Sequence, residues 1–294
     1  MRNYHQTAVK TFMTSHFSRK YWEFTLPSGH GNETYFVKSE EDKFFVKLGS
    51  RADIYHAIAD IGLTPPILTA GYLEDGTSII VQKFIAGRMP GRLDFRLHLK
   101  DFAVAIKKIH QCLEVRKTLP VVKTDRFNII GIQVLDHIQS KWNKYKLLVP
   151  DSVGMIDRAI DQLREKVIGF QGSGLVASHN DINNSNWIIT PDGKFYLIDL
   201  DSMSLDDPAL DVGALLWWYY PPELRQEFLE VVGYADDQEF KTRMQVRMTM
   251  HCLNIILPRE NSFDSFDPES FSENLIDFKA IMVGKENPQG YNDY

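Results

Sequence analysis

Residues 178–201 read SHNDINNSNWIITPDGKFYLIDLD, and the fold prediction starts from this stretch. Asp181 follows His179 by two positions. Asn186 lies five positions after Asp181, and Asp199 lies eighteen positions after it. Two carboxylates and one amide therefore recur around a short apolar segment.

The apolar runs within this stretch are typical of two short strands. Trp187–Ile189 and Phe195–Ile198 are strand-like, and Asp192-Gly193 between them is a strong hairpin signal. We expect this hairpin to hold the two carboxylates and the amide near one another.

Phosphoryl transfer needs such a layout. One carboxylate orients or deprotonates a hydroxyl, and an amide and a second carboxylate hold Mg²⁺ on the phosphates. Asp181 is the candidate for the first role, and Asn186 and Asp199 are the candidate metal ligands. Either aspartate could instead be structural, but a carboxylate that ends an apolar strand, as Asp199 does, is costly unless it is paired or bound to metal. Asp201 is either a second metal ligand or a solvated neighbour, and it is also a candidate contact of the acceptor.

Composition restricts the class of protein. The chain has 294 residues, is 44% hydrophobic and has a net charge of −6. It has no Lys/Arg-rich stripe, so no nucleic-acid partner is expected. No apolar run approaches the roughly 20 residues that span a bilayer. With no apolar signal core and only Cys112 and Cys252, a soluble cytoplasmic protein with free thiols is expected.

The chain divides into two expected parts, 1–86 and 87–294, with Gly87–Gly91 as a hinge. The first part has strand signals in two hairpins and one helix: Glu33–Lys38 with Lys43–Leu48, Gly71–Leu73 with Ser78–Phe84, and Arg51–Ile61. The second part has helical periodicity and a polar tail, expected to be loose, from Gly284. The expected helices are Phe95–Val115, Asn128–Leu148, Ser152–Ile168, Leu210–Tyr220, Glu223–Val232 and Asp237–Leu257.

Lys47 lies within an apolar strand, where a lysine either reaches the edge or meets an anion. Kinases use a strand lysine on the ATP phosphates and hold it with a helix carboxylate. Asp53 is the candidate partner, although it is shorter than the usual glutamate. A glycine-containing turn could cover the phosphates with backbone N–H groups: Ser28, Gly29, Gly31 and Asn32.

Two further polar residues have a structural interpretation. His179 is expected to fix its loop to the core rather than to act as a base. Asp211 opens an apolar helix and is expected either to accept hydrogen bonds from the backbone of the loop at Asp181 or to be an ordinary helix-start aspartate.

The motifs at 179–186 and 197–213 resemble those of the aminoglycoside phosphotransferase and choline kinase superfamily, and the resemblance covers nearly the whole chain. It implies an α+β, two-lobed protein-kinase-like fold with a small sheet-rich N-lobe and a mostly helical C-lobe. It implies Asp181 as catalytic base, Asn186 and Asp199 as Mg²⁺ ligands, and Lys47 on the phosphates of ATP. The backbone at Gln82, Phe84 and Ile85 would contact adenine.

The sequence departs from the family pattern in informative ways. Asn180 stands where aminoglycoside enzymes usually have glycine and where choline and ethanolamine kinases often have asparagine. The glycine-containing turn lacks GxGxxG. Asp207 follows Asp199 by only eight positions, too few for a protein-kinase activation segment, which favours a small-molecule acceptor.

Aromatic residues at the end of the 210–220 helix have two interpretations. The four aromatic residues Trp217, Trp218, Tyr219 and Tyr220 cannot all face inward. They either pack in the core or form an aromatic wall that holds an ammonium group by cation–π contact. The second interpretation agrees with the acidic net charge.

We therefore expect a small-molecule kinase that uses ATP and Mg²⁺. A choline- or ethanolamine-like acceptor, an aminoglycoside, and a sugar or homoserine-like alcohol are all compatible with the residues. The alternative is a nucleotide-binding pseudokinase or regulatory module. The presence of Lys47, Asp181, Asn186 and Asp199 together argues against that alternative.

Overall fold

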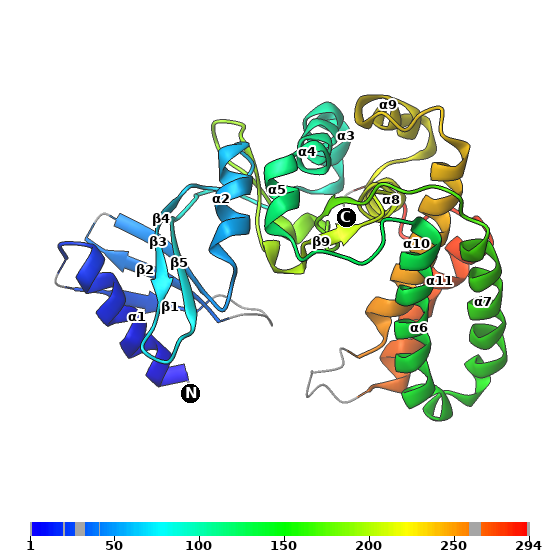
Figure 1. The fold of residues 1–294 in the computed structure, drawn as a ribbon, viewed down its shortest axis with the longest axis horizontal. Coiled ribbons are helices and arrows are strands. Elements are labelled where there is room, and N and C mark those ends of the chain that lie inside the picture. The colour runs from blue at the N-terminus through cyan, green and yellow to red at the C-terminus, as the bar shows by residue number, and fades with distance from the viewer. Residues whose placement is uncertain (1, 20, 27–32, 41, 259–265, 293–294) are drawn as a thin grey trace. The chain divides into compact units, whose positions relative to one another are not determined.

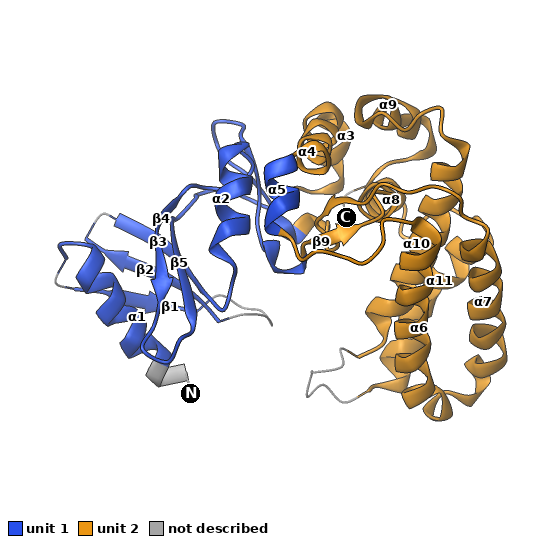
Figure 2. Ribbon diagram, in the orientation of Figure 1, with its two compact units in different colours: residues 1–89, 113–118, 185–202 blue, residues 90–112, 119–184, 203–294 orange. Residues whose placement is uncertain are grey.

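The computed structural model describes residues 2–19, 21–26, 33–40, 42–258 and 266–292. The chain divides into two compact units (Figure 2). The first unit comprises 1–89, 113–118 and 185–202, and the second comprises 90–112, 119–184 and 203–294. The hairpin that the sequence analysis grouped with the helical half thus lies in the first unit.

A five-stranded antiparallel sheet forms the first unit, with strand order β1-β2-β3-β5-β4 (Figure 1). Both expected hairpins are confirmed, since β2 pairs with β3 and β4 pairs with β5. The strands are β1 Glu23–Thr25, β2 Thr34–Ser39, β3 Asp42–Leu48, β4 Ile67–Tyr72 and β5 Ser78–Lys83.

Strand alternation gives the two faces of this sheet different neighbours. Val46 on β3 belongs to a buried cluster that includes Val9 and Met13 of helix α1 (Arg2–His16). Lys47 follows Val46 and therefore points to the opposite face, where it meets helix α2 (Ala52–Asp60). The sequence analysis predicted α2 but not α1.

The predicted hairpin is present as β7 (Trp187–Ile189) and β8 (Phe195–Leu197). It is tied to the first unit by paired backbone hydrogen bonds between Arg88 and Ile189, of 3.0 and 2.8 Å. A Cβ on Gly87 would lie 2.4 Å from Ile188 Cγ2 and 2.7 Å from the Ile189 carbonyl oxygen. The chain can approach the hairpin this closely because residue 87 is glycine.

Helices dominate the second unit. The single helix expected over 95–115 is instead three, because the backbone leaves the helical region at His98 and at Cys112. The third of these pieces belongs to the first unit. Helix α11 was not predicted. Apart from α5 Leu113–Thr118, which belongs to the first unit, the helices are α3 Arg92–Leu97, α4 Leu99–Gln111, α6 Phe127–Tyr145, α7 Pro150–Ile168, α8 Ala209–Tyr219, α9 Pro222–Val232, α10 Gln238–Ile256 and α11 Pro268–Met282.

Helix α8 is the buried element of the second unit, with ten of its eleven residues buried. A helix that is apolar all round needs neighbours on every side, and α8 packs against α10. A Cβ added to Gly213 would lie 3.1 Å from the Met244 carbonyl oxygen. Just before α8, a two-stranded antiparallel sheet pairs β6 (Val176–Ser178) with β9 (Ser204–Asp206). Among the described residues, no helix combines the length and apolar character needed to cross a bilayer.

The polar tail is held against the second unit, contrary to the expectation that it is loose. Asn287 is buried and donates to the Trp218 carbonyl oxygen. Arg92 donates to the backbone and side-chain oxygens of Gln289. The prediction rested on polarity alone and was wrong, because these polar groups form hydrogen bonds within the protein rather than with water.

Candidate active site

Lys47 is the centre of a polar cluster in the first unit. Its Nζ lies 2.6 Å from both Asp199 Oδ1 and Asp201 Oδ2, and 3.2 Å from Tyr55 Oη. The Lys47 side chain is 6% exposed, whereas those of Asp199 and Asp201 are 50% and 24% exposed. Burial opposes the charge of the ammonium, but the surrounding oxygens of Tyr55, Asp201 and Asp199 outweigh it and raise the pKa of Lys47. The cation is therefore fixed, while Asp199 is still open to solvent.

The structure contradicts Asp53 as the partner of Lys47. Asp53 is half exposed and pairs with Arg51 at 2.7 Å. Tyr55 occupies the position against Lys47, and its hydroxyl also accepts the Leu200 N–H at 3.4 Å. Burial raises the pKa of Tyr55 to about 12, so it stays protonated. Asp53 and Tyr55 are two positions apart on α2, and only the buried face of the helix reaches the sheet.

The hairpin brings Asn186 beside the strand that leads to Asp199. The Ile198 N–H donates to the Asn186 carbonyl oxygen at 2.8 Å, and Asn186 is buried. Asp199 has a φ of 58°, in the left-handed region that residues other than glycine rarely adopt. In the described part of the chain, no group of three or more His, Cys, Asp or Glu could hold a metal ion. The candidate Mg²⁺ ligands, one amide and one or two carboxylates, form a smaller set than such a group.

The loop at 179–184 belongs to the second unit and is anchored by Asp211. The backbone N–H groups of His179 and Asn180 donate to its two carboxylate oxygens at 2.8 and 2.9 Å. His110 Nε2 lies 3.1 Å from the same carboxylate, which is 1% exposed. Burial alone would raise the pKa of Asp211, but the hydrogen bonds from His110 and the loop outweigh it and lower that pKa. The expected contact with the loop backbone is confirmed.

Sequence reasoning missed His110. Its only signal was a polar residue on the buried face of the helix expected over 95–115. His179 is completely buried, in keeping with the structural role expected for it.

The backbone conformation at Asn180 explains why asparagine can stand where the motif usually has glycine. Its φ is 64°, a conformation that glycine adopts without strain and that asparagine tolerates better than most residues. Its side chain donates to Ser204 Oγ at 2.8 Å. The following residue, Asp181, is partly exposed, and its Oδ1 accepts from Asn183 Nδ2 at 2.8 Å.

The aromatic residues expected near an acceptor have different surroundings. Tyr220 is fully buried and packs against Phe95 and Phe228, so it is a core residue and cannot form part of an acceptor wall. Trp217 is also buried. Trp218 is partly exposed. Tyr219 is buried, and its hydroxyl accepts the Asn184 N–H at 2.9 Å.

The residues expected to contact a nucleotide are placed as follows. Gln82 is buried on β5, between Phe45 and Ile67 of the flanking strands. Phe84 donates its N–H to the Lys43 carbonyl oxygen at 3.0 Å, and Ile85 is partly exposed. The glycine-containing turn lies outside the described residues: Ser28, Gly29, Gly31 and Asn32.

Solved structures share this fold at low sequence identity. Spectinomycin phosphotransferase in complex with ADP and spectinomycin is 17% identical, with a TM-score of 0.62, over 95% of this chain and 96% of that one. Choline kinase LicA from Streptococcus pneumoniae is 17% identical, with a TM-score of 0.56, over 92% and 98%. The GDP complex of aminoglycoside 2'-phosphotransferase-IIIa is 12% identical, with a TM-score of 0.67, over 95% and 98%.

The fold is thus α+β and kinase-like, with an antiparallel sheet in the N-terminal part and a helical C-terminal part. The model of the phosphotransferase enzyme family matches residues 25–244, which include Lys47, the loop at 179–184, the hairpin and Asp211. The chain belongs to the phosphotransferase enzyme family.

Proposed function

We propose that this chain is an ATP- and Mg²⁺-dependent kinase that phosphorylates a hydroxyl group of a small molecule. The observation that carries the proposal is the buried Lys47 ammonium held 2.6 Å from the half-exposed Asp199 carboxylate, at the end of the hairpin that also contains Asn186. A fixed cation beside an open carboxylate suits a polyphosphate and its metal ion. The ADP and GDP complexes among the similar structures agree with a nucleotide ligand.

The donor set fits magnesium. Mg²⁺ prefers oxygen ligands and is usually held by one or two carboxylates together with substrate phosphates. Asp199 and Asn186 would supply such oxygens, and the bound ion would neutralise charge on the transferred phosphoryl group. Lys47 would contact the phosphates, with Tyr55 and Asp201 keeping its ammonium in place.

Asp181 is the proposed base for the acceptor hydroxyl. Its loop is fixed by the contacts of Asp211 with the two preceding N–H groups, which would hold the carboxylate in one orientation. For the nucleotide base, we propose the backbone at Gln82, Phe84 and Ile85. The turn with Ser28, Gly29, Gly31 and Asn32 is proposed to cover the phosphates.

The acceptor is proposed to be a small molecule. Similar structures include complexes with spectinomycin, streptomycin and kanamycin, and a choline kinase. Those names and the net charge favour a cationic acceptor, but among the four aromatic residues at 217–220 only Trp218 is partly exposed. The aromatic cluster therefore does not define the charge of the acceptor.

The test is transfer of labelled phosphate from ATP to a panel of hydroxyl compounds: choline, ethanolamine, aminoglycosides, sugars and hydroxy acids. We expect transfer to one class in the presence of Mg²⁺, and none after chelation. The Asp181→Asn variant is the control for contaminating kinases. ATP binding with no transfer to any acceptor would instead favour the pseudokinase alternative.

A further inference from the structure

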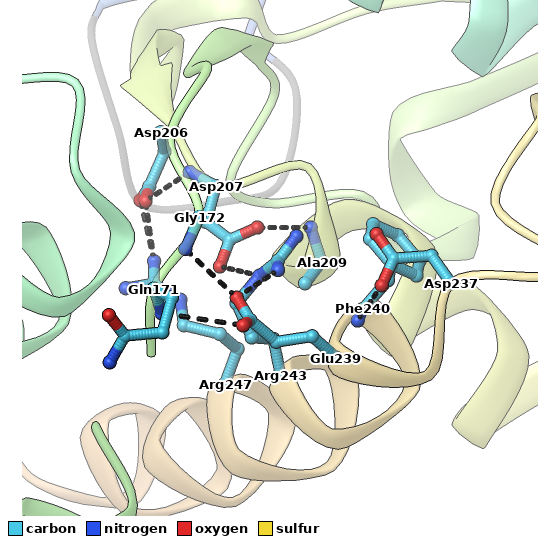
Figure 3. Close-up of polar contacts among 10 residues, drawn as sticks. All are labelled: Gln171, Gly172, Asp206, Asp207, Ala209, Asp237, Glu239, Phe240, Arg243 and Arg247. Carbon is cyan, nitrogen blue, oxygen red and sulfur yellow. Dashed lines mark hydrogen bonds and ion pairs between the residues drawn. The ribbon is translucent and has the colours of Figure 1, made fainter. Parts of the chain in front are cut away.

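Two arginines on α10, one helical turn apart, make ion pairs with consecutive aspartates (Figure 3). Arg243 pairs with Asp207 and Arg247 pairs with Asp206. Both arginines are 3% exposed. Because residue type, helix and burial are the same, any difference in their hydrogen bonding reflects a difference in their surroundings.

Arg243 is held on several sides. Its Nε donates to Asp207 at 3.0 Å, its Nη1 donates to Glu239 at 2.9 Å, and its guanidinium lies 3.8 Å from the centre of the Phe127 ring. Glu239 also accepts from the backbone of Gly172, as Figure 3 shows. This arginine joins α10 to the loops around it and has a structural role.

Arg247 is held at one end only. Its Nη2 donates to both oxygens of Asp206 at 2.7 Å. Within the part of the chain that the structure describes, its Nε and Nη1 are buried without a hydrogen-bond partner. Buried N–H donors of a charged group without an acceptor are costly. An oxygen from outside the chain would remove this cost.

Arg247 lines a cavity of about 380 Å³ in the second unit. Asp206, Asn180, His137, His251 and Asn254 line it too, whereas Arg243 does not. The volume suits a small molecule. The lining of the cavity is mostly apolar but contains several side chains able to donate hydrogen bonds.

The loop at 179–184 borders this cavity. Asn180, which lines it, directly precedes Asp181. Burial and the charge of Arg247 lower the pKa of His251 to about 4. The Asp181 carboxylate acts on the same imidazole and raises its pKa, but by less. His251 is thus neutral at pH 7. The buried Lys141 side chain donates to Asn254, which also lines the cavity.

We infer that this cavity binds the acceptor and that the acceptor carries a carboxylate, which accepts hydrogen bonds from Nε and Nη1 of Arg247. A guanidinium favours a carboxylate over neutral oxygens because both partners are charged. The inference rests on the proposed function, since the hydroxyl of the same molecule would meet Asp181. The acceptor class is then a hydroxy acid, including a hydroxyl-bearing amino acid.

Two measurements on the wild-type protein test the inference without any substitution. The first compares phosphate transfer to short hydroxy acids and to their carboxamides, and the second measures binding of the same pairs by calorimetry. We expect the acid to be preferred roughly ten- to hundredfold, the range for a hydrogen bond to a charged group. Binding of the acid without transfer would count against the proposed function and leave the carboxylate site standing. No preference for the acid in either measurement would overturn the inference, and transfer to a sugar or a cationic alcohol would then leave only the kinase assignment.

Paired variants locate the site. Asp206→Asn with Arg247→Gln removes the guanidinium without leaving an unpaired buried carboxylate. We expect it to abolish the preference for the acid and to leave binding of ATP unchanged. Asp207→Asn with Arg243→Gln is the matched control and should keep the preference, with thermal unfolding used to confirm that each variant is folded. An acid preference that survives the loss of Arg247 would overturn the assignment to this cavity.

Discussion

Asp199 in the first unit and Asp211 in the second are both aspartates that the sequence analysis singled out, yet their surroundings are opposite. Asp199 is half exposed, has a left-handed backbone conformation and faces one buried cation. Asp211 is 1% exposed and accepts three hydrogen bonds from His110 and the loop. An exposed carboxylate can exchange its partner for a ligand, whereas a buried one with fixed donors cannot. We therefore propose a ligand-binding role for Asp199 and a positioning role for Asp211.

The largest expected effect separates these roles at Asp199. We expect Asp199→Ala to abolish Mg²⁺-dependent nucleotide binding, because its carboxylate is the proposed charged ligand. Lys47 keeps Asp201, so the fold should persist. Calorimetry with a non-hydrolysable ATP analogue and a Mg²⁺ titration measures this. Asp192→Ala, an exposed aspartate in the turn of the same hairpin, is the control. Wild-type metal dependence in Asp199→Ala would remove it from the site.

A second substitution affects the chemical step. Asp181→Asn is expected to leave ATP binding nearly unchanged and to lower phosphate transfer by ~10²-fold or more, the range for a lost general base. Steady-state kinetics with the accepted substrate measure this. Unchanged turnover would mean that Asp181 has no part in the reaction.

Asp211→Asn should act on stability first. An amide cannot accept all three hydrogen bonds, and breaking such a buried network costs about 3 kcal/mol of the free energy of unfolding. Because the pKa of Asp211 is lowered on folding, its contribution is present above the unfolded-state pKa and is lost as the pH falls through the folded-state pKa.

Urea unfolding at neutral and acidic pH measures this contribution. The variant should lose less stability than the wild type as the pH falls through that window. Equal acid sensitivity in the two proteins would contradict the positioning role.

The smallest expected effect is at Tyr55. Tyr55→Phe removes one hydrogen bond to Lys47 but leaves both carboxylates, so we expect the ATP requirement to rise only several-fold, the equivalent of about 1 kcal/mol. Lys47→Ala sets the upper limit in the same assay. If Tyr55→Phe were as severe as Lys47→Ala, the hydroxyl rather than the carboxylates would hold the ammonium.

Local patterns predicted much of the fold. Alternation and turn chemistry correctly predicted the hairpins of the sheet and β7–β8, and apolar periodicity predicted α6 to α10. Helix α1 was missed because its buried face is limited to a few apolar residues such as Val9 and Met13 in a polar sequence.

Contacts between distant residues were harder to predict. Sequence order suggested Asp53 for Lys47, but residues two apart on a helix are separated by about 200° around its axis, so only one of Asp53 and Tyr55 can face the sheet. His110 and Arg247 could not be recognised either, because each gains its meaning from a partner far along the chain.

The division of the chain into two interleaved units has a consequence for synthesis on the ribosome. The polypeptide passes between the units five times, and the hairpin at 185–202 completes the first unit. The sheet of residues 23–83 is therefore made long before the Ile189 backbone that binds Arg88 and the Leu197 N–H that donates to Leu63. Nascent chains that end before residue 185 should lack these contacts and should require chaperones or rapid elongation to avoid association.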